Sequence, residues 1–478
     1  MAAITERSAT ALAAAIRTRE VTSLVVVEAH IDVLQRTAEQ LNAVVVDRYE
    51  QARAEAAAVD AELAASKQPA GSFLGVPFTV KESIQLEGMP NAAGLLARRN
   101  HLAPFTAPSV QRVIDAGAIP LGVTNTSELT LSIESDNPLY GRTNNPYDLR
   151  RTAGGSSGGE GAAVGVGGSP FGVASDIAGS IRIPALFCGV FGHKPSSGLV
   201  PNTGMFPPSA GESSRMLSTG PITRRAEDLM PLLRLMAGPD GEDPVATAVE
   251  LGDPTAVSFE GLSVTVVEES SMLSMSRELR DAREQAVGAL LAAGAVVRRV
   301  KLRAWRRATM PYLAVLQQLG GSEARSTGEL LVESGEEPPS LRSVLSGRGR
   351  HRLTTRIALS TELLPGSDRL PERQVNAGRR IAAQLIEAIG DGVLLHPAHP
   401  YPAPRHGRTI GRPWLMTPAS VFNLAGVPVT EVPLGLSDAG LPLGVQVAAA
   451  HGADHLSIAV ALKLEQIFGG WRPPALKR

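Results

Sequence analysis

Gly154-Gly-Ser-Ser-Gly-Gly-Glu-Gly161 is the stretch that decides the fold of this chain, together with Phe171-Gly-Val-Ala-Ser-Asp-Ile-Ala-Gly-Ser-Ile-Arg-Ile-Pro184. Its repeated glycines allow the backbone to approach neighbouring segments closely. Residues 171–175 predict a buried strand, and residues 180–186 predict a short helix after a tight turn. A strand that leads through such a turn into a helix is typical of α/β proteins.

Strands and helices alternate on both sides of this stretch, from about residue 73 onward. Strands are expected at 74–80, 119–123, 263–267, 295–301, 393–395, 428–433 and 443–448, and helices at 108–116, 275–293, 372–389 and 454–468. This alternation predicts an α/β layer fold whose sheet is mostly parallel or mixed.

Two regions depart from the alternation. Apolar residues recur at helical spacing over about 5–18, 22–40 and 49–66, so residues 1–70 are expected to form an N-terminal helical segment that packs on the core. Residues 71–478 are then the main domain. Within it, residues 303–370 lack clear alternation and mix arginines with apolar helical stretches, which predicts a helical insertion.

Composition and charge exclude several classes of protein. The chain has 46 Lys and Arg against 47 Asp and Glu, so its overall charge suggests neither a nucleic-acid partner nor an anionic membrane surface. Its one cysteine, Cys188, lies among apolar residues and excludes a disulfide framework. No apolar run approaches the roughly 20 residues of a membrane span, and no signal peptide is evident. The sequence therefore predicts a cytoplasmic protein without a metal ion or cofactor.

Four interpretations compete for the glycine-rich stretch. A P-loop would end in Gly-Lys-Ser/Thr, whereas Glu160 and Gly161 stand here. A dinucleotide-binding loop requires Gly-x-Gly-x-x-Gly spacing, which the stretch does not provide convincingly. A flexible Gly/Ser linker is a further interpretation. A nucleophile elbow formally fits around Ser156 and requires a histidine base, for which the candidates are His193, His396, His399, His406, His451 and His455.

Ser180 and Lys81 each admit a functional and a structural interpretation. Ser180 lies at a helix start, where converging backbone N–H groups suit an oxyanion, although serine is more often a plain N-cap there. Lys81 ends an apolar strand, where a charge is costly to bury. It either snorkels to water or is a desolvated lysine whose lowered pKa lets it act as a general base. The residues alone leave these alternatives open.

Together these segments resemble the amidase signature family. Lys81, Ser156 and Ser180 match its lysine after an apolar strand, its serine in a Gly-Gly-Ser-Ser-Gly-Gly loop and its serine in an Asp-Ile-Gly-Gly-Ser-Ile-Arg-like turn. The separations of 75 and 24 residues match as well, and the motifs are most similar to those of fatty acid amide hydrolase 2-like members. Other family-like segments cover nearly the whole chain, least over 245–390: 124–125, 141–149, 192–198, 220–221, 422–428 and 440–446.

The resemblance implies a three-layer α/β/α sandwich with a large mixed β-sheet core, and an amidase with a Ser-Ser-Lys triad. Lys81 would be the general base, Ser156 would relay the proton from a cis peptide with Gly155, and Ser180 would attack the amide carbonyl to form an acyl-enzyme. Because Lys81 must be neutral, activity is expected to rise toward alkaline pH. The oxyanion would be held by the backbone N–H groups of Ile177, Ala178, Gly179 and Ser180. The supporting residues would be Gly155, Ser157, Ser175, Asp176 and Arg182.

The chain departs from the family pattern at two places. Ala178 stands where a glycine is common, which reduces the space beside the oxyanion donors. His396 and His399 stand where less polar residues are expected. A metal site at these histidines would need a third ligand, so none is expected.

The substrate is the least determined part of the prediction. The acyl pocket is expected to include Thr130, Leu131, Ile133 and Thr417, with the insertion at 303–370 as its lid. Its apolar content predicts a fatty-acyl or aryl substrate, with small aryl amides, anilides or hydrazides as the alternative. The other candidate functions are an inactive binding protein and an amidotransferase A-type subunit. The N-terminal helices could pair two copies of the chain into a homodimer.

Overall fold

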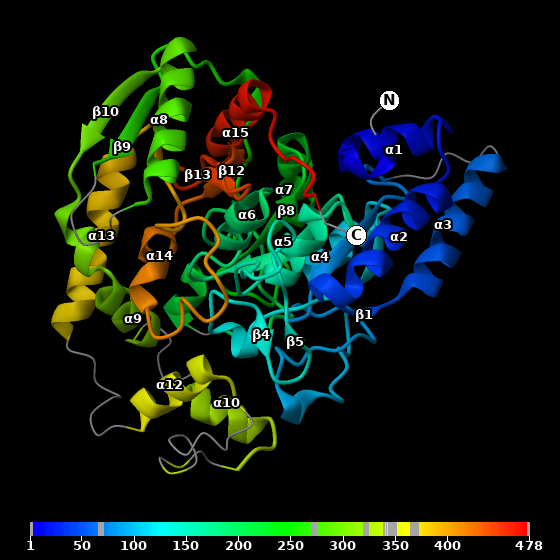
Figure 1. The fold of residues 1–478 in the computed structure, drawn as a ribbon, viewed down its shortest axis with the longest axis horizontal. Helices are drawn as coiled ribbons and strands as arrows, with labels where there is room; N and C mark the ends of the chain where they lie inside the picture. The colour runs from blue at the N-terminus through cyan, green and yellow to red at the C-terminus, as the bar shows by residue number, and fades with distance from the viewer. Residues whose placement is uncertain are drawn as a thin grey trace.

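A large mixed sheet runs through the centre of the computed structural model (Figure 1). The structure describes residues 3–65, 71–209, 211–268, 275–318, 325–337, 340, 342, 351–363 and 372–475. In the order in which they pair, the sheet's described strands are β1 (Val44–Asp47), β3 (Ile119–Thr124), β2 (Pro77–Lys81), β6 (Phe171–Asp176), β8 (Ser218–Thr223), β7 (Phe191–Lys194), β12 (Val429–Leu436), β13 (Pro442–Ala449), β11 (Val393–His396), β9 (Ser263–Val267) and β10 (Val296–Val300). A separate hairpin pairs β4 (Asp136–Asn137) with β5 (Gly141–Arg142).

Helices cover both faces of this sheet. The described helices are α1 (Ala9–Arg17), α2 (Ser23–Leu41), α3 (Tyr49–Ala64), α4 (Pro108–Asp115), α5 (Gly158–Gly165), α6 (Arg182–Cys188), α7 (Leu229–Met236), α8 (Arg277–Ala292), α9 (Thr309–Gln318), α10 (Thr327–Glu333), α12 (Leu353–Glu362), α13 (Glu372–Ile389), α14 (Thr417–Ala425) and α15 (Asp454–Phe468). Successive side chains of a strand point to opposite faces. On β11, Val393 and Leu395 pack in the cluster that contains α8 and α15, whereas Leu394 packs with α13 and α14. The fold is therefore the expected α/β sandwich.

Three neighbouring parallel strands define the region that matters for function. β2 lies between β3 and β6 and is parallel to both. The carboxyl ends of parallel neighbours meet at one edge of a sheet, which is where α/β proteins place their sites. Lys81, Thr124 and Asp176 are the last residues of β2, β3 and β6 and so lie at that edge.

Most of the expected strands and helices are present, and the strands that the sequence did not predict share a physical cause. The expected strands and helices recur with boundaries shifted by a few residues. The strands β7 and β8 in the middle of the sheet were not expected, because Gly192, His193 and Lys194 in β7 and Gly220 and Pro221 in β8 are poor strand formers. The helices α7 and α14 were not expected either. Burial on both faces of the sheet overrides these weak local propensities.

The predicted insertion is described only in part. Its described helices are α9, α10 and α12, and α9 packs on α13 and α14. Residues 319–324, 338–339, 341, 343–350 and 364–370 of the insertion lie outside the described residues. Within the predicted N-terminal segment, α2 packs on α3 and β1 pairs with β3 of the central sheet. The division of the chain at residue 70 stays a prediction.

Candidate active site

Lys81 is completely buried at the end of β2, and its ammonium nitrogen meets two serines. The Nζ atom donates to Ser156 Oγ at 2.6 Å and to Ser175 Oγ at 2.9 Å. Burial lowers the pKa of Lys81 to about 7, against the raising influence of the Asp176, Glu160 and Glu82 carboxylates. Burial thus favours the free amine form of Lys81, which can accept a proton.

The loop that carries Ser156 is clamped against the neighbouring segment 132–135. The peptide bond between Gly155 and Ser156 is cis, as the resemblance implied. Ser135 Oγ donates to the Ser156 carbonyl oxygen at 2.8 Å and accepts from Gly158 N at 2.8 Å. A Cβ atom at position 155 would lie 2.6 Å from the Ser132 carbonyl oxygen, so only glycine fits there.

Asp176 and Arg182 shape the turn after β6. Both are completely buried, and Arg182 Nη2 lies 2.9 Å from Asp176 Oδ1. Asp176 also accepts from Gly179 N at 2.8 Å and from Ile181 N at 3.1 Å. Burial alone would raise the pKa of Asp176, but the Arg182 guanidinium and the Asn423 amide hold it below its usual range. The carboxylate is thus ionised and ties the turn to the start of α6.

Ser180 is nearly buried beside the Ser156 loop. Its side chain lies in the turn at 4% exposure, and its carbonyl oxygen accepts from Ser157 N at 3.4 Å. The helix α6 begins at Arg182 with Ile181 as its N-cap residue and no side-chain cap. The N-cap interpretation of Ser180 is therefore wrong.

The residues that carry the four expected oxyanion donors differ in the contacts they make. The Gly179 N–H donates to Asp176 Oδ1, so this group is already engaged. Gly179 has a φ of 107°, and a Cβ there would lie 2.5 Å from the Ala419 side chain. The side chains of Ile177 and Ala178 pack against the cluster that contains Tyr312, whose Oη donates to the Ile177 carbonyl oxygen at 2.8 Å.

Three of the histidines named for the nucleophile elbow contact other residues. His193 Nε2 lies 3.0 Å from Asp454 Oδ1, and its Nδ1 lies 2.9 Å from Thr430 Oγ1. His396 packs edge-on against Trp305, and His399 packs edge-on against Phe187. The partner of Ser156 is a lysine, so the elbow interpretation is wrong for Ser156. Across the described part of the chain, no group of three or more potential metal ligands is found.

The expected pocket residues are not all brought together. Ile133 packs with Ile183 and Ala419, beside the start of α6. Thr417 is buried at the start of α14, where its Oγ1 lies 2.7 Å from Thr309 Oγ1 of α9. Thr130 is half-buried and Leu131 is 44% exposed. Ile133 thus lies close to the turn, whereas Leu131 points largely to solvent.

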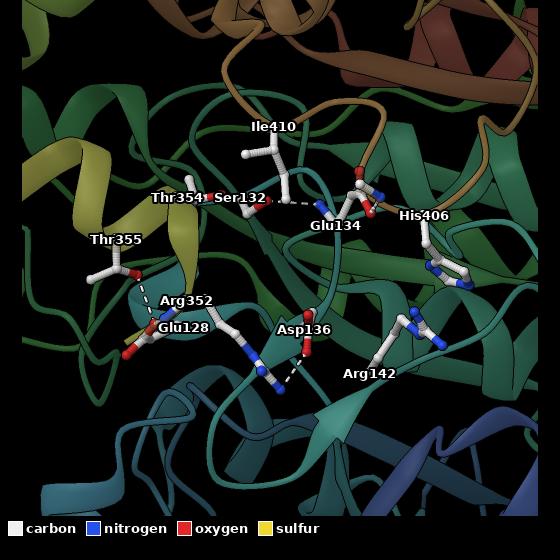
Figure 2. Close-up of a pocket in the computed structure, with 11 residues that line it drawn as sticks. Glu128, Ser132, Glu134, Asp136, Arg142, Arg352, Thr354, Thr355, His406 and Ile410 are labelled. Carbon is white, nitrogen blue, oxygen red and sulfur yellow. Dashed lines mark hydrogen bonds and ion pairs between the residues drawn. The ribbon is translucent and has the colours of Figure 1, made fainter. Parts of the chain in front are cut away.

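A polar cavity of about 220 Å³ lies next to the clamped loop (Figure 2). Its carboxylates are held by protein partners: Glu134 accepts from Gly407 N at 2.8 Å, and Arg352 reaches from the start of α12 to Asp136 at 2.9 Å. None of the four expected pocket residues lines it. The lining residues are Glu128, Ser132, Glu134, Asp136, Arg142, Arg352, Thr354, Thr355, His406, Gly407 and Ile410.

Several residues of the site were not singled out from the sequence. Asn423 Nδ2 donates to Asp176 Oδ1 at 2.9 Å, and Gln446 Oε1 accepts from Arg182 at 2.8 Å. Both lie in family-like segments of the C-terminal part, at 422–428 and 440–446. Glu160 is a charged residue in a helix that otherwise consists of glycine, alanine and valine. This contrast in the sequence could have marked Glu160 as a residue with a specific buried contact.

The chain is a sandwich with a buried lysine–serine pair at the carboxyl edge of its sheet, and comparison with known proteins identifies its family. The family model "Amidase" matches residues 25–457. The chain belongs to the amidase family and is a hydrolase that acts on amide C–N bonds. In the described part of the chain, no helix combines the length and apolar character needed to cross a membrane.

The similar proteins include vertebrate relatives and a solved hydrolase structure. The chain is 42% identical to Fatty-acid amide hydrolase 2-A of Danio rerio, over 98% of this chain and 90% of that protein. It is 40% identical to Fatty-acid amide hydrolase 2 of Homo sapiens, over 97% and 89% respectively. Among solved structures, 6-aminohexanoate cyclic dimer hydrolase superposes with a TM-score of 0.83 at 26% identity, covering 99% of each chain.

Proposed function

We propose that this amidase works through a Ser-Ser-Lys triad formed by Lys81, Ser156 and Ser180. The observation that carries the proposal is the 2.6 Å hydrogen bond from Lys81 Nζ to Ser156 Oγ inside a fully buried site. A neutral Lys81 accepts the Ser156 proton while Ser156 takes the proton of Ser180. The Ser180 oxygen then attacks the amide carbonyl carbon and forms a tetrahedral oxyanion.

The second half of the cycle uses the same relay in reverse. Ser156 donates its proton to the leaving nitrogen as the C–N bond breaks and regains a proton from the Lys81 ammonium. The acyl group then remains on Ser180 as an ester, and water hydrolyses it. We assign Ser156 as the relay because the buried Lys81 nitrogen is already held by Ser156 and Ser175.

The developing oxyanion would be held by backbone N–H groups of the turn. Those of Ile177, Ala178 and Ser180 are the donors we assign, with Gly179 shared with Asp176. Donors fixed in a water-poor site need no reorganisation when the charge develops, and losing one typically costs a factor of about 10² or more in rate. The Asp176–Arg182 pair supports these donors by fixing the turn.

We assign a hydrophobic acyl group to the substrate. The relatives called fatty-acid amide hydrolase 2 share about 40% of their residues with this chain over nearly its whole length. The apolar side of the turn supports the same assignment, since Ile177 and Ala178 pack with Met416 and Leu424 around the side chain of Tyr312. Small aryl amides, anilides and hydrazides are the alternative substrates.

A substrate series tests the acyl preference. Amides of one amine with acyl chains from acetyl to oleoyl, together with a benzoyl and an anilide member, would be compared by kcat/KM. A rise of kcat/KM with chain length supports the fatty-acyl assignment. Hydrolysis confined to short polar amides would refute it.

Covalent labelling tests the nucleophile. The purified chain should be labelled by a fluorophosphonate, and Ser180→Ala should abolish the label. Ser169→Ala is the matched control, because Ser169 is another buried serine, whose hydroxyl donates to the Phe171 carbonyl oxygen instead. Undiminished labelling of Ser180→Ala would assign the nucleophile elsewhere, and failure of the wild type to label would favour an inactive binding protein.

The amidotransferase alternative has weaker support. The chain is 33% identical to the A-type chain of Glutamyl-tRNA(Gln) amidotransferase from Deinococcus radiodurans, over 82% of this chain and 84% of that protein. Hydrolysis of simple amides by the purified chain without partner proteins would separate the two functions. A strict requirement for partner proteins would favour the alternative.

A further inference from the structure

Glu160 is the single ionisable residue of α5, and its side chain points into the sheet. All eight residues of α5 are buried, and the others are glycine, alanine or valine. Glu160 is 0% exposed. Burying a carboxyl group is costly unless it is hydrogen-bonded, so its retention calls for a specific contact.

Three adjacent strands enclose the Glu160 carboxyl group. Thr79 Oγ1 of β2 donates to Glu160 Oε2 at 2.6 Å, and Thr124 Oγ1 of β3 donates to Glu160 Oε1 at 2.9 Å. On β6, a Cβ atom at Gly172 would lie 1.8 Å from Oε2, so this glycine makes room for the carboxyl. The carboxyl group therefore hydrogen-bonds α5 to β2 and β3 and fills the space left by Gly172 on β6.

These contacts place Glu160 in register with Lys81. Thr79 stands two residues before Lys81, on the same face of β2. Thr124 is the residue that pairs with Lys81 across β2 and β3. Since α5 begins directly after Ser157, the carboxyl connects the strand of Lys81 to the helix that follows the Ser156 loop.

The other two carboxyl groups that influence Lys81 have different partners. Asp176 is paired with Arg182, and Glu82 accepts from Ala92 N at 2.7 Å and from Tyr140 Oη at 3.2 Å. Glu160 likewise accepts from neutral groups, the two threonine hydroxyls, which bring no opposite charge to the carboxyl group. Burial raises the pKa of Glu160 to about 8, with the two threonine hydroxyls and the Lys81 charge acting in the opposite direction.

We propose that Glu160 is a positioning residue of this amidase: its carboxyl group holds α5, the helix that follows the Ser156 loop, in register with Lys81, and its ionised form favours the protonated state of Lys81. The proposal rests on the proposed function, in which Lys81 is the base. A nearby negative charge favours the protonated lysine, so removing it lets Lys81 lose its proton at lower pH.

The test is the rate of fluorophosphonate labelling of wild type and Glu160→Gln from pH 5 to pH 10. The glutamine keeps the shape of the side chain and removes its charge. The midpoint of the alkaline-rising profile should move down, by at most about one pH unit because Glu160 is only partly ionised below pH 8. The plateau rate should fall about tenfold, since the loop is less well positioned. Glu431→Gln is the matched control, because Glu431 is equally buried but is not among the charges that act on Lys81.

An unchanged midpoint in Glu160→Gln overturns the proposal, whatever happens to thermal stability. If that variant does not fold, Thr79→Val and Thr124→Val each remove one hydroxyl donor and favour the neutral carboxyl. Each should shift the midpoint in the same direction by a smaller amount, and unchanged midpoints in both overturn the proposal as well. Lys81→Ala distinguishes failure of this proposal from failure of the proposed function. Labelling of Lys81→Ala at the wild-type rate refutes the proposed function itself.

Discussion

At the residue scale, the proposed chemistry depends on a lysine that loses its proton near neutral pH. Lys81 is surrounded by protein on every side, and burial disfavours its charged form. The carboxylates of Asp176, Glu160 and Glu82 limit this effect. The site thus balances desolvation against charge, and the balance places the pKa within the working range of a general base.

The rate of amide hydrolysis should follow the deprotonation of Lys81. The pKa of Lys81 is lowered to about 7, so kcat/KM should rise with pH through that value and then level off. Lys81→Arg keeps the positive charge but cannot deprotonate, and should lower kcat/KM by about 10²–10⁴. Steady-state kinetics with one amide from pH 5 to pH 10 measures both effects. A rate that falls above neutrality would contradict the assignment of Lys81 as base.

The Asp176–Arg182 pair should be important for stability as well as for the turn. Asp176→Asn leaves Arg182 as a buried charge without its counter-ion, which should lower the free energy of unfolding by about 3–5 kcal/mol. Asp32→Asn is the control, because Asp32 and Arg36 form an ion pair on the surface and should contribute less than about 1 kcal/mol. Urea unfolding of the two variants measures the difference. Equal effects would show that burial of the pair does not matter.

At the scale of elements, the composition of α5 allows close packing against its neighbours at the expense of helix propensity. Four of its eight residues are glycine, which disfavours a helix. A Cβ atom at Gly159 would lie 2.3 Å from Asn125 N, and one at Gly161 would lie 3.0 Å from the Pro184 side chain. The glycines let the helix approach β3 and α6, and this approach brings the Ser156 loop to Lys81.

Gly159→Ala should therefore destabilise the protein although alanine is the better helix former. The clash with the Asn125 backbone should cost about 1–3 kcal/mol and should displace the Ser156 loop, which lowers kcat. Gly288→Ala in α8 is the matched control, since a Cβ there meets no atom within 4 Å. It should stabilise the protein by about 0.5–1 kcal/mol and leave kcat unchanged. Thermal unfolding and kcat of both variants show whether close packing or helix propensity determines the effect of an alanine at position 159.

At the scale of the whole molecule, the C-terminal residues contact elements from the opposite end of the chain. Trp471 is 5% exposed and packs in the cluster that includes Val27 and Leu34 of α2. Its Nε1 donates to the carbonyl oxygen of Gly165, the last residue of α5, at 2.9 Å. One side chain near the end of the chain thus joins the N-terminal helices to the helix that follows the Ser156 loop.

Trp471→Ala should loosen this junction. Truncation of a buried tryptophan typically costs about 3–5 kcal/mol, and protection of the α5 amides against hydrogen exchange should fall with it. Trp414→Ala is the control, because Trp414 is 48% exposed and its loss should change stability by about 0.5 kcal/mol or less. Unfolding curves and hydrogen exchange of both variants measure the difference. Wild-type protection of α5 in Trp471→Ala would contradict a structural role for this contact.

The sequence by itself was sufficient for the class of fold, the family and most of the elements. Periodicity, glycine positions and the spacing of Lys81, Ser156 and Ser180 are properties of the order of residues along the chain, so they can be recognised without the structure. It was not sufficient for β7 and β8, whose glycine, proline and charged residues hide central strands. Such strands exist because their neighbours in the sheet supply the hydrogen bonds and the burial that local propensity does not.

Tertiary structure decided which side chains meet. β2 pairs with β6 across about 90 residues of sequence, and this pairing brings Lys81 to Ser175 and Ser156. It also closes three strands around Glu160. Hydrogen bonds act over about 3 Å, and a distance of that size between remote residues is set by strand order and helix packing rather than by the residues themselves.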